Sequence, residues 1–216
     1  MGKLTNGIGE RNCFDTKYLT FIESFDRELA KTRLVDGGLI EKINSYLREE
    51  NTACEGGGDF ENKLNKILHQ GTSTPHYWFY KLDYLLWKDE NIWTDLPKAF
   101  EKFNKSRFRL SRLNSIEHMH PQSKRDDWKG DNGECQSIDC FGNLALVSNH
   151  MNSALNAQDG QNKRQDIQKQ LNNGTIESLK MILAYSKYEE WNMDNCAEHQ
   201  GKMIGLLSND LGCGLN

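Results

Sequence analysis

The residues best suited to chemistry stand together in a seven-residue stretch, Ile-Glu-His-Met-His-Pro-Gln, at positions 116–122. A histidine suits a general base because its pKa lies near working pH. A glutamate offers a hard carboxylate oxygen, which magnesium and manganese prefer as a ligand. One imidazole cannot easily act as both base and metal ligand. We therefore assign proton removal to His118 and metal binding to Glu117.

A second stretch, at positions 140–152, supplies amide side chains. Asn143 stands at the start of a short apolar run and is expected to fix the imidazole of His118 through a main-chain or side-chain contact. Asn152 offers a neutral oxygen as a second metal ligand. Asn156 lies one helical turn further on and shares its face, as another ligand or a water-holding group. The nine residues from Asn143 to Asn152 fit a strand, a turn and the first turn of a helix.

Together these side chains suit one divalent ion, magnesium or manganese, that would act on a phosphate. Positive charge brackets both stretches, as phosphate binding requires. The candidate nucleic-acid contacts are Lys124, Arg125, Lys163 and Arg164. The competing interpretation of either cluster alone is an ordinary solvated basic face.

Two histidines near the motifs have other interpretations. His150 is a rival to Asn152 as metal ligand, but its spacing from Asn143 is two residues short. His120, inside the first stretch, is expected to be structural rather than catalytic.

The six cysteines include Cys135 and Cys140, which stand five positions apart and form half of a conceivable zinc site. No Cys-x-x-Cys pair occurs, and no second pair stands at a convincing spacing. We therefore expect free, mostly buried thiols and no structural zinc.

The elements that must position these side chains are mostly helical. Apolar residues recur at helical spacing over residues 15–31, 39–47, 60–69, 76–89, 96–104, 176–188 and 190–207. Residues 144–147 predict a short strand, and residues 151–171 predict a helix or a helix pair. The first 14 residues show no clear period and are expected to be a loose start. The aromatic segment 76–89 favours a core helix over a base-stacking surface, because Phe79, Leu82 and Leu86 share one face.

The predicted fold class is therefore α+β and mostly α-helical, with a helical N-terminal region, a ββα-metal hairpin-helix unit and C-terminal helices. We expect residues 1–108 to form the helical scaffold or partner-docking region. Residues 109–216 would form the hairpin-helix unit with the C-terminal helices, within one compact globule.

Composition narrows the class of protein. The chain has 216 residues, of which 27% are charged and 37% hydrophobic, as in soluble globular proteins. Its net charge of −4 argues against a nucleic-acid coat protein, but not against an enzyme that touches nucleic acid locally. No apolar run approaches the roughly 20 residues that span a bilayer, and no signal peptide is evident. We expect a cytoplasmic protein without membrane contact.

The two stretches resemble the HNH nuclease domain at the C-terminal end of GmrSD-type type IV restriction enzymes. That family has Ile/Val-Glu/Asp-His-Ile-x-Pro-Gln, then Gly-Asn-Leu-x-Leu-x-Ser, then Asn-x-x-Leu-Ser/Asn-Asn and a downstream lysine. Positions 116–122, 142–148 and 152–156, followed by Lys163, match this order. The Asp-His-x-x-Pro-Gln of CRISPR effector HNH domains is similar. The resemblance covers about residues 76–170.

The resemblance implies an endonuclease that hydrolyses phosphodiester bonds, with DNA favoured, as the effector of a bacterial anti-phage or restriction system. It implies His118 as base, Glu117 and Asn152 as metal ligands, Asn143 as the orienting residue and Lys163 as a phosphate contact. Two alternatives stay open: an RNA-cutting effector, for example one acting on tRNA, and a non-catalytic nucleic-acid-binding module. The intact Glu-His-Asn set argues against the second.

Two departures from the family stand out. The family often has Ile-x-x-Arg after a tryptophan, but no arginine follows Trp191 here, and His199 is the candidate substitute. Residues 1–75 do not resemble the family's large nucleotide-dependent N-terminal domain. We therefore expect control by a separate regulatory partner, such as an ATPase or a sensor, that docks on the aromatic helical N-terminal half.

Overall fold

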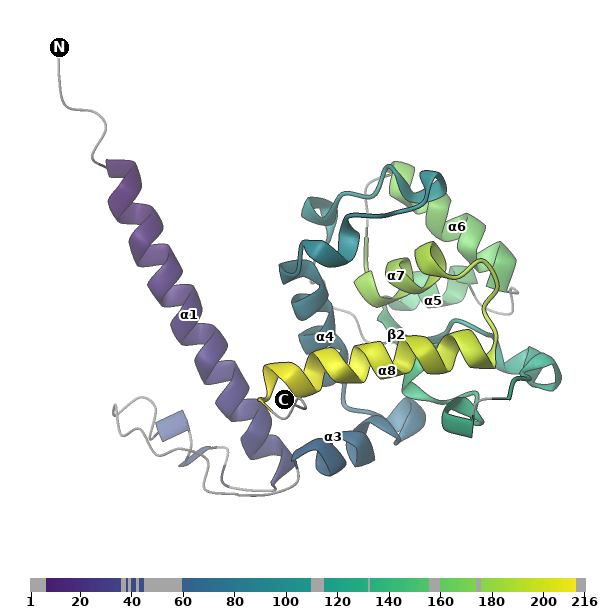
Figure 1. Ribbon diagram of the computed structural model, residues 1–216, viewed down its shortest axis with the longest axis horizontal. Helices are drawn as coiled ribbons and strands as arrows, with labels where there is room; N and C mark the ends of the chain where they lie inside the picture. The colour runs from purple at the N-terminus through teal and green to yellow at the C-terminus, as the bar shows by residue number, and fades with distance from the viewer. Residues whose placement is uncertain are drawn as a thin grey trace, which may run out of the picture. The chain divides into compact units, whose positions relative to one another are not determined.

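The computed structural model describes residues 7–35, 38, 40–41, 43–44, 60–109, 115–131, 133–155, 160–173 and 176–212. The chain divides into two compact units, one formed by Met1–Leu64 with Ser208–Asn216 and the other by Asn65–Leu207. Figure 1 shows the helices and strands along the chain. All candidate site residues predicted from the sequence belong to the second unit.

The first unit is built on the long helix α1 (Gly7–Leu34), with parts of α3 (Phe60–Leu68) and α8 (Met193–Asp210). Within this unit Arg27 Nη2 lies 3.5 Å from Asp210 Oδ1. The expectation of a loose start is wrong from Gly7 onward. Helix propagation gains one hydrogen bond per residue, so extension from a formed helix outweighs weak local propensity. The helix predicted over residues 39–47 lies largely outside the described residues.

The core of the second unit forms where α4 (His76–Lys88) packs against α7 (Leu179–Lys187) and the strand β2. Phe79, Leu82 and Leu86 of α4 are buried. The ring centroid of Phe79 lies 5.1 Å from that of Phe141, in the segment before β2. The prediction that this aromatic helix serves the core is therefore confirmed.

The sheet consists of β1 (Ser115–His118) and β2 (Leu144–Val147), paired antiparallel. Glu117 pairs with Ala145, and His118 pairs with Leu144. All four residues of β2 are buried, which explains its continuous apolar sequence. The predicted strand over 144–147 and the mostly helical α+β fold class are confirmed.

Side-chain caps set the ends of the later helices. The predicted helix pair is present as α5 (Asn149–Leu155) and α6 (Gly160–Asn173). The helix α7 begins three residues later than predicted because Ser178 caps it, with its Oγ accepting from Met181 N at 3.3 Å. Asn192 lies directly before α8 and caps it in the same way, because its Oδ1 accepts from Asn195 N at 3.0 Å.

The helix predicted over residues 96–104 is wrong. The structure has only one short 3-10 turn there, Lys98–Phe100, and a second, Lys105–Arg107, follows it. Phe100 is fully buried, and its N–H donates to the Pro97 carbonyl at 2.7 Å, three residues back rather than four. Burial of this ring therefore fixes a tight turn where the local pattern favours a helix.

The predicted boundary at residue 108 lies inside the second unit. Phe108 forms a parallel bridge with Ile176, and α4 packs against β2. The residues on either side of the predicted boundary thus share one core.

Among the helices that the structure describes, none combines the length and apolar character needed to cross a bilayer.

Candidate active site

The predicted hairpin-helix unit is present as β1, β2 and α5. Ser148 joins β2 to α5 and caps the helix, since its Oγ accepts from Met151 N at 3.2 Å. Glu177 fixes this corner, accepting from Ser148 N at 2.8 Å and from Ser148 Oγ at 2.9 Å. The two motifs are thereby brought onto one compact unit (Figure 1).

Glu117 is a buried carboxylate, and among the residues that the structure describes Lys163 is the cation paired with it. Its residue is 5% exposed, and its Oε1 accepts a hydrogen bond from Lys163 Nζ. Lys163 is 1% exposed and also donates to the carbonyl of His118. The ammonium thus neutralises the metal-ligand candidate and fixes the main chain of the base candidate.

This placement of Lys163 corrects the phosphate contact that the resemblance implies. The side chain points into the protein, where burial lowers the pKa of its ammonium while the charge of Glu117 opposes that shift. A buried ammonium must be paired, and Glu117 is the partner at hand. In the structure Lys163 is an internal counter-ion, not a surface cation.

His118 has a carboxylate partner that sequence reasoning missed. Its Nε2 lies 2.7 Å from Asp139 Oδ1, and the same oxygen accepts from Gln122 Nε2 at 3.0 Å. Partial burial raises the pKa of Asp139, but the hydrogen bonds from His118 and Gln122 outweigh it and hold that pKa below its ordinary value. Asp139 therefore stays ionised and orients the imidazole.

A signal for Asp139 exists in the sequence. The residue stands four positions before Asn143, so a pairing of the two motif strands brings it near the end of β1. A histidine base needs a group that selects its tautomer, and a carboxylate is the usual one.

Asn143 is fully buried and uses both ends of its amide. Its Oδ1 accepts from His120 N at 2.7 Å and from Trp191 Nε1 at 2.9 Å. Its Nδ2 donates to His120 O at 3.1 Å and to Ile138 O at 2.8 Å, and its main-chain carbonyl accepts from Met119 N at 2.9 Å. Asn143 thus fixes the main chain that follows His118, while Asp139 contacts the imidazole itself.

Asn152 lies on the side of β1 that carries Glu117. Its Nδ2 donates to Ser115 Oγ at 2.7 Å. Ser115 and Glu117 are two positions apart on one strand, so their side chains share a face. Asn156 lies outside the described residues. The rival ligand His150 is exposed.

His120 makes the structural contacts predicted for it. Its Nε2 lies 2.9 Å from the Lys124 carbonyl, and its ring centroid is 5.0 Å from that of Trp128. These contacts hold the segment after the first motif against the protein.

The predicted nucleic-acid contacts differ in accessibility. Arg125 is exposed on the 3-10 segment Gln122–Asp127 directly after the motif, and Lys124 is half-buried there. Arg164 instead contacts protein, with its Nε donating to Tyr185 O at 2.9 Å and its guanidinium 5.7 Å from the Phe100 ring centroid.

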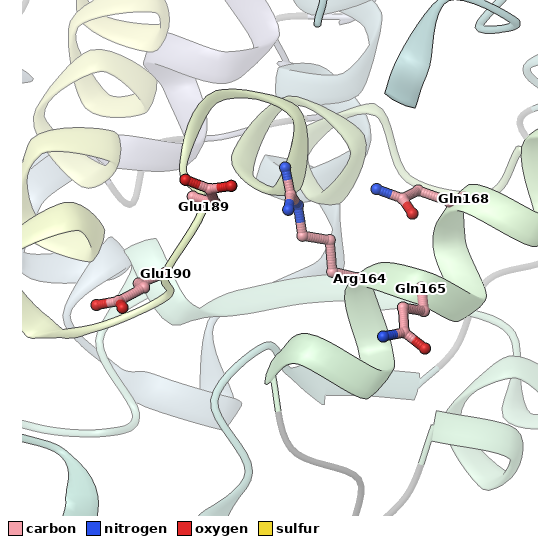
Figure 2. Close-up of a pocket in the computed structure, with 5 residues that line it drawn as sticks. All are labelled: Arg164, Gln165, Gln168, Glu189 and Glu190. Carbon is pink, nitrogen blue, oxygen red and sulfur yellow. The ribbon is translucent and has the colours of Figure 1, made fainter. Parts of the chain in front are cut away.

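Arg164 also lines a polar cavity of about 380 Å³ with Gln165, Gln168, Glu189 and Glu190. Figure 2 shows the arginine and both glutamines on α6, across from the two glutamates on the segment before α8. Two carboxylates in the same cavity repel a phosphate, so this cavity does not suit a nucleic-acid backbone. Arg125 is the most exposed of the four predicted nucleic-acid contacts.

The donor chemistry on the Glu117 face fits a hard divalent ion. Glu117 offers a carboxylate and Asn152 an amide oxygen. Magnesium typically keeps several waters and takes only one or two protein carboxylates, together with substrate phosphate. A site for a softer metal, or one whose coordination is filled by the protein, would need more nitrogen or sulfur ligands than the described residues place on this face.

Most of the chain matches one known protein family. Residues 59–206 match the family model described as "GmrSD restriction endonucleases, C-terminal domain". Searches of curated proteins and of solved structures each returned no match. The matched segment spans the hairpin, α5, α6 and the helices that pack around them. The chain therefore belongs to the family of C-terminal domains of GmrSD restriction endonucleases.

Proposed function

We propose that the chain is a metal-dependent endonuclease of the HNH type that hydrolyses phosphodiester bonds in DNA. The observation that carries the proposal is the arrangement at the end of β1. There His118 is held by the Asp139 carboxylate, and the adjacent Glu117 lies on the strand face that Asn152 contacts.

In this mechanism His118 takes the proton from the attacking water. A carboxylate at Nε2 selects the tautomer with hydrogen on that nitrogen, which leaves Nδ1 as the basic atom. Asp139 then stabilises the imidazolium that forms, as an orienting carboxylate does in other histidine-based sites.

Glu117 and Asn152 would hold one Mg²⁺ or Mn²⁺ ion. Such an ion polarises the scissile phosphate and stabilises the leaving oxygen. Lys163 compensates the buried charge of Glu117, so it positions the ligand rather than touching substrate. Arg125, on the surface beside the site, would contact the nucleic-acid backbone.

The family supports DNA as the substrate, since its description names restriction endonucleases. The same description supports, as part of this proposal, a role as the effector of a bacterial anti-phage or restriction system. RNA cleavage is the second candidate, because metal-assisted hydrolysis acts on either backbone.

The test is cleavage of supercoiled plasmid DNA and of total RNA by the purified chain, with magnesium, with manganese and with chelator. We expect DNA cleavage that needs metal and that falls at least about 10²-fold in His118→Ala and Glu117→Gln. The matched control is His76→Ala, an exposed histidine on α4, which should cut like wild type.

Equal cleavage by wild type and His118→Ala would overturn the mechanism. Cleavage of RNA alone would replace DNA with RNA as the substrate, and cleavage in excess chelator would remove the metal.

We further propose that a regulatory protein, such as an ATPase or sensor, docks on the N-terminal helical region. The support is a set of large apolar side chains on α1 that are exposed: Tyr18, Leu19, Phe21 and Ile22. Cleavage of nucleic acid by the purified chain alone, at the full rate seen in the cell, would overturn this docking.

A further inference from the structure

Three cysteines meet inside the second unit although the sequence spreads them over 62 positions. Cys140 Sγ lies 3.5 Å from Cys196 Sγ, and Cys196 Sγ lies 3.5 Å from Cys135 Sγ. All three sulfurs lie within 4.8 Å of one another, and all three residues are buried. Cys135 and Cys140 alone form only half of a zinc site. Cys196, in the first turn of α8, supplies a third thiol.

The sulfur separations suit metal coordination rather than a disulfide. A disulfide needs sulfurs about 2.05 Å apart, and the three thiols here are free. Thiolates that share a tetrahedral zinc ion at about 2.3 Å from each sulfur lie about 3.8 Å from one another. The observed 3.5 Å separations are therefore close to the edges of such a tetrahedron.

His199 stands one helical turn after Cys196 and is 1% exposed. Its Nε2 is buried without a hydrogen-bond partner. A buried ring nitrogen left without a partner destabilises the fold, and coordination to a metal would relieve this cost. Because His199 lies outside the 4.8 Å group of sulfurs, its ring must turn toward them to bind the same ion.

The positive charge of Lys180 beside the three cysteines also suits a zinc–thiolate site. Lys180 is 2% exposed, and its Nζ donates to the carbonyls of Phe141 and Leu144, close enough to the three sulfurs to interact electrostatically. A zinc ion with three thiolates and one neutral imidazole carries one net negative charge. That charge would join the Asp83 carboxylate, which also interacts with this ammonium, in compensating the buried charge of Lys180.

We propose that Cys135, Cys140 and Cys196, with His199 as the fourth ligand, bind one structural zinc ion. The site is separate from the proposed Glu117–Asn152 metal face, and it does not depend on nuclease activity. It replaces the expectation of no structural zinc, which rested on the absence of a second closely spaced cysteine pair.

Such an ion would clamp the loop before β2 onto α8. The loop residues Asp139 and Asn143, which hold the first motif, lie beside Cys140. Gly142 makes the contact possible, since a Cβ there would lie 2.7 Å from the Cys196 sulfur. Its N–H donates to Gln200 Oε1 at 2.9 Å, one turn along α8.

The direct test is elemental analysis of the full chain, purified without a metal-affinity tag under reducing conditions. We expect one equivalent of zinc per chain in wild type and in His118→Ala, whose nuclease site is damaged. Cobalt substitution should give the thiolate charge-transfer band and the intense visible bands of a tetrahedral site. These readouts require no variant of the cluster, so misfolding cannot hide a negative answer.

Variants then assign the ligands. Cys135→Ser, Cys140→Ser and Cys196→Ser should each lower zinc occupancy at a fixed free zinc concentration by at least about 10-fold, and His199→Ala should do the same. His69→Ala, on an exposed helix end, is the control and should keep its zinc.

Wild type that takes up neither zinc nor cobalt while its thiols stay reduced overturns the site. Full zinc occupancy in Cys196→Ser overturns it equally. Unchanged occupancy in His199→Ala removes the histidine from the ligand set. If the chain binds zinc but fails to cut nucleic acid, the proposed nuclease function is refuted and the proposed zinc site is supported.

Discussion

The imidazole of His118 and the carboxylate of Asp139 form a pair, with Nε2 and Oδ1 2.7 Å apart. The two residues are 21 positions apart and come from β1 and the loop before β2. Gln122 donates to the same carboxylate oxygen, so the acceptor is itself held in place.

Asp139→Asn should lower kcat by about 10²–10⁴-fold while leaving the fold intact. An amide can replace one hydrogen bond but cannot stabilise an imidazolium by charge. The measurement is single-turnover cleavage with circular dichroism as a check on folding. Asp126→Asn, an exposed aspartate on the next segment, is the control. Wild-type kcat in Asp139→Asn would show that the pair is not part of the mechanism.

Removing the buried counter-ion of Glu117 should destabilise the protein strongly. Lys163→Met leaves a carboxylate buried without its cation, and we expect a loss on the order of 3 kcal/mol in the free energy of unfolding. In the double variant Glu117→Gln/Lys163→Met the loss should be smaller than the sum of the single losses. Urea unfolding of all four proteins measures the coupling. Strictly additive losses would contradict the ion pair.

Asn143→Ala should destabilise the second unit by about 3 kcal/mol or more, because it leaves two buried and two part-buried groups of the main chain and side chains without their partner. Asn104→Ala is the matched control. That asparagine caps an exposed 3-10 turn, so its loss should cost about 1 kcal/mol. Equal losses in the two variants, measured by chemical unfolding, would argue against the central place of Asn143.

The buried Asp83 should make stability depend on pH in an unusual direction. Burial raises its pKa to about 7, against the opposing hydrogen bond and charge of Lys180. The folded state therefore keeps a proton that the unfolded state loses above the ordinary aspartate pKa of 3.8. Stability from this group is fully present below that value and falls as pH rises toward 7, by at most about 1.4 kcal/mol per pH unit.

Asp83→Asn should remove this slope, while Asp95→Asn, an exposed aspartate, should keep it. The readout is the free energy of unfolding from urea titrations between about pH 4 and pH 7. A parallel pH dependence in wild type and Asp83→Asn would show that Asp83 ionises normally.

Arg125→Ala should weaken DNA binding and reduce the slope of log K against log salt by about one. The exposed guanidinium beside the site is placed to displace one counter-ion from the phosphate backbone. Lys66→Ala, on α3, should change neither quantity. Fluorescence anisotropy over a range of salt concentrations, with the His118→Ala protein as background to prevent cleavage, gives both values.

The local sequence pattern alone was enough to predict the elements whose signal lies within a few neighbouring residues. The apolar run 144–147 specifies β2 to the residue, and the helical spacing of Phe79, Leu82 and Leu86 specifies a core helix. The hairpin-helix unit was predicted from the family resemblance that the order Glu117, His118, Asn143 and Asn152 carries, and the structure has the strands paired. The same reasoning failed at residues 96–104, where burial of Phe100 overrides helical propensity.

Tertiary structure alone decided the roles that depend on neighbours distant in sequence. Lys163 carries a positive charge, which in the sequence suits a phosphate contact equally well. Its burial against Glu117, which lies 46 positions away in the sequence, makes it a counter-ion instead. Asp139 becomes the partner of His118, and Cys196 joins Cys135 and Cys140, because the packing of loops and α8 closes long separations. Residue type fixes which chemistry a side chain is able to perform. The burial and the charges that packing places around it determine which of those chemistries it performs.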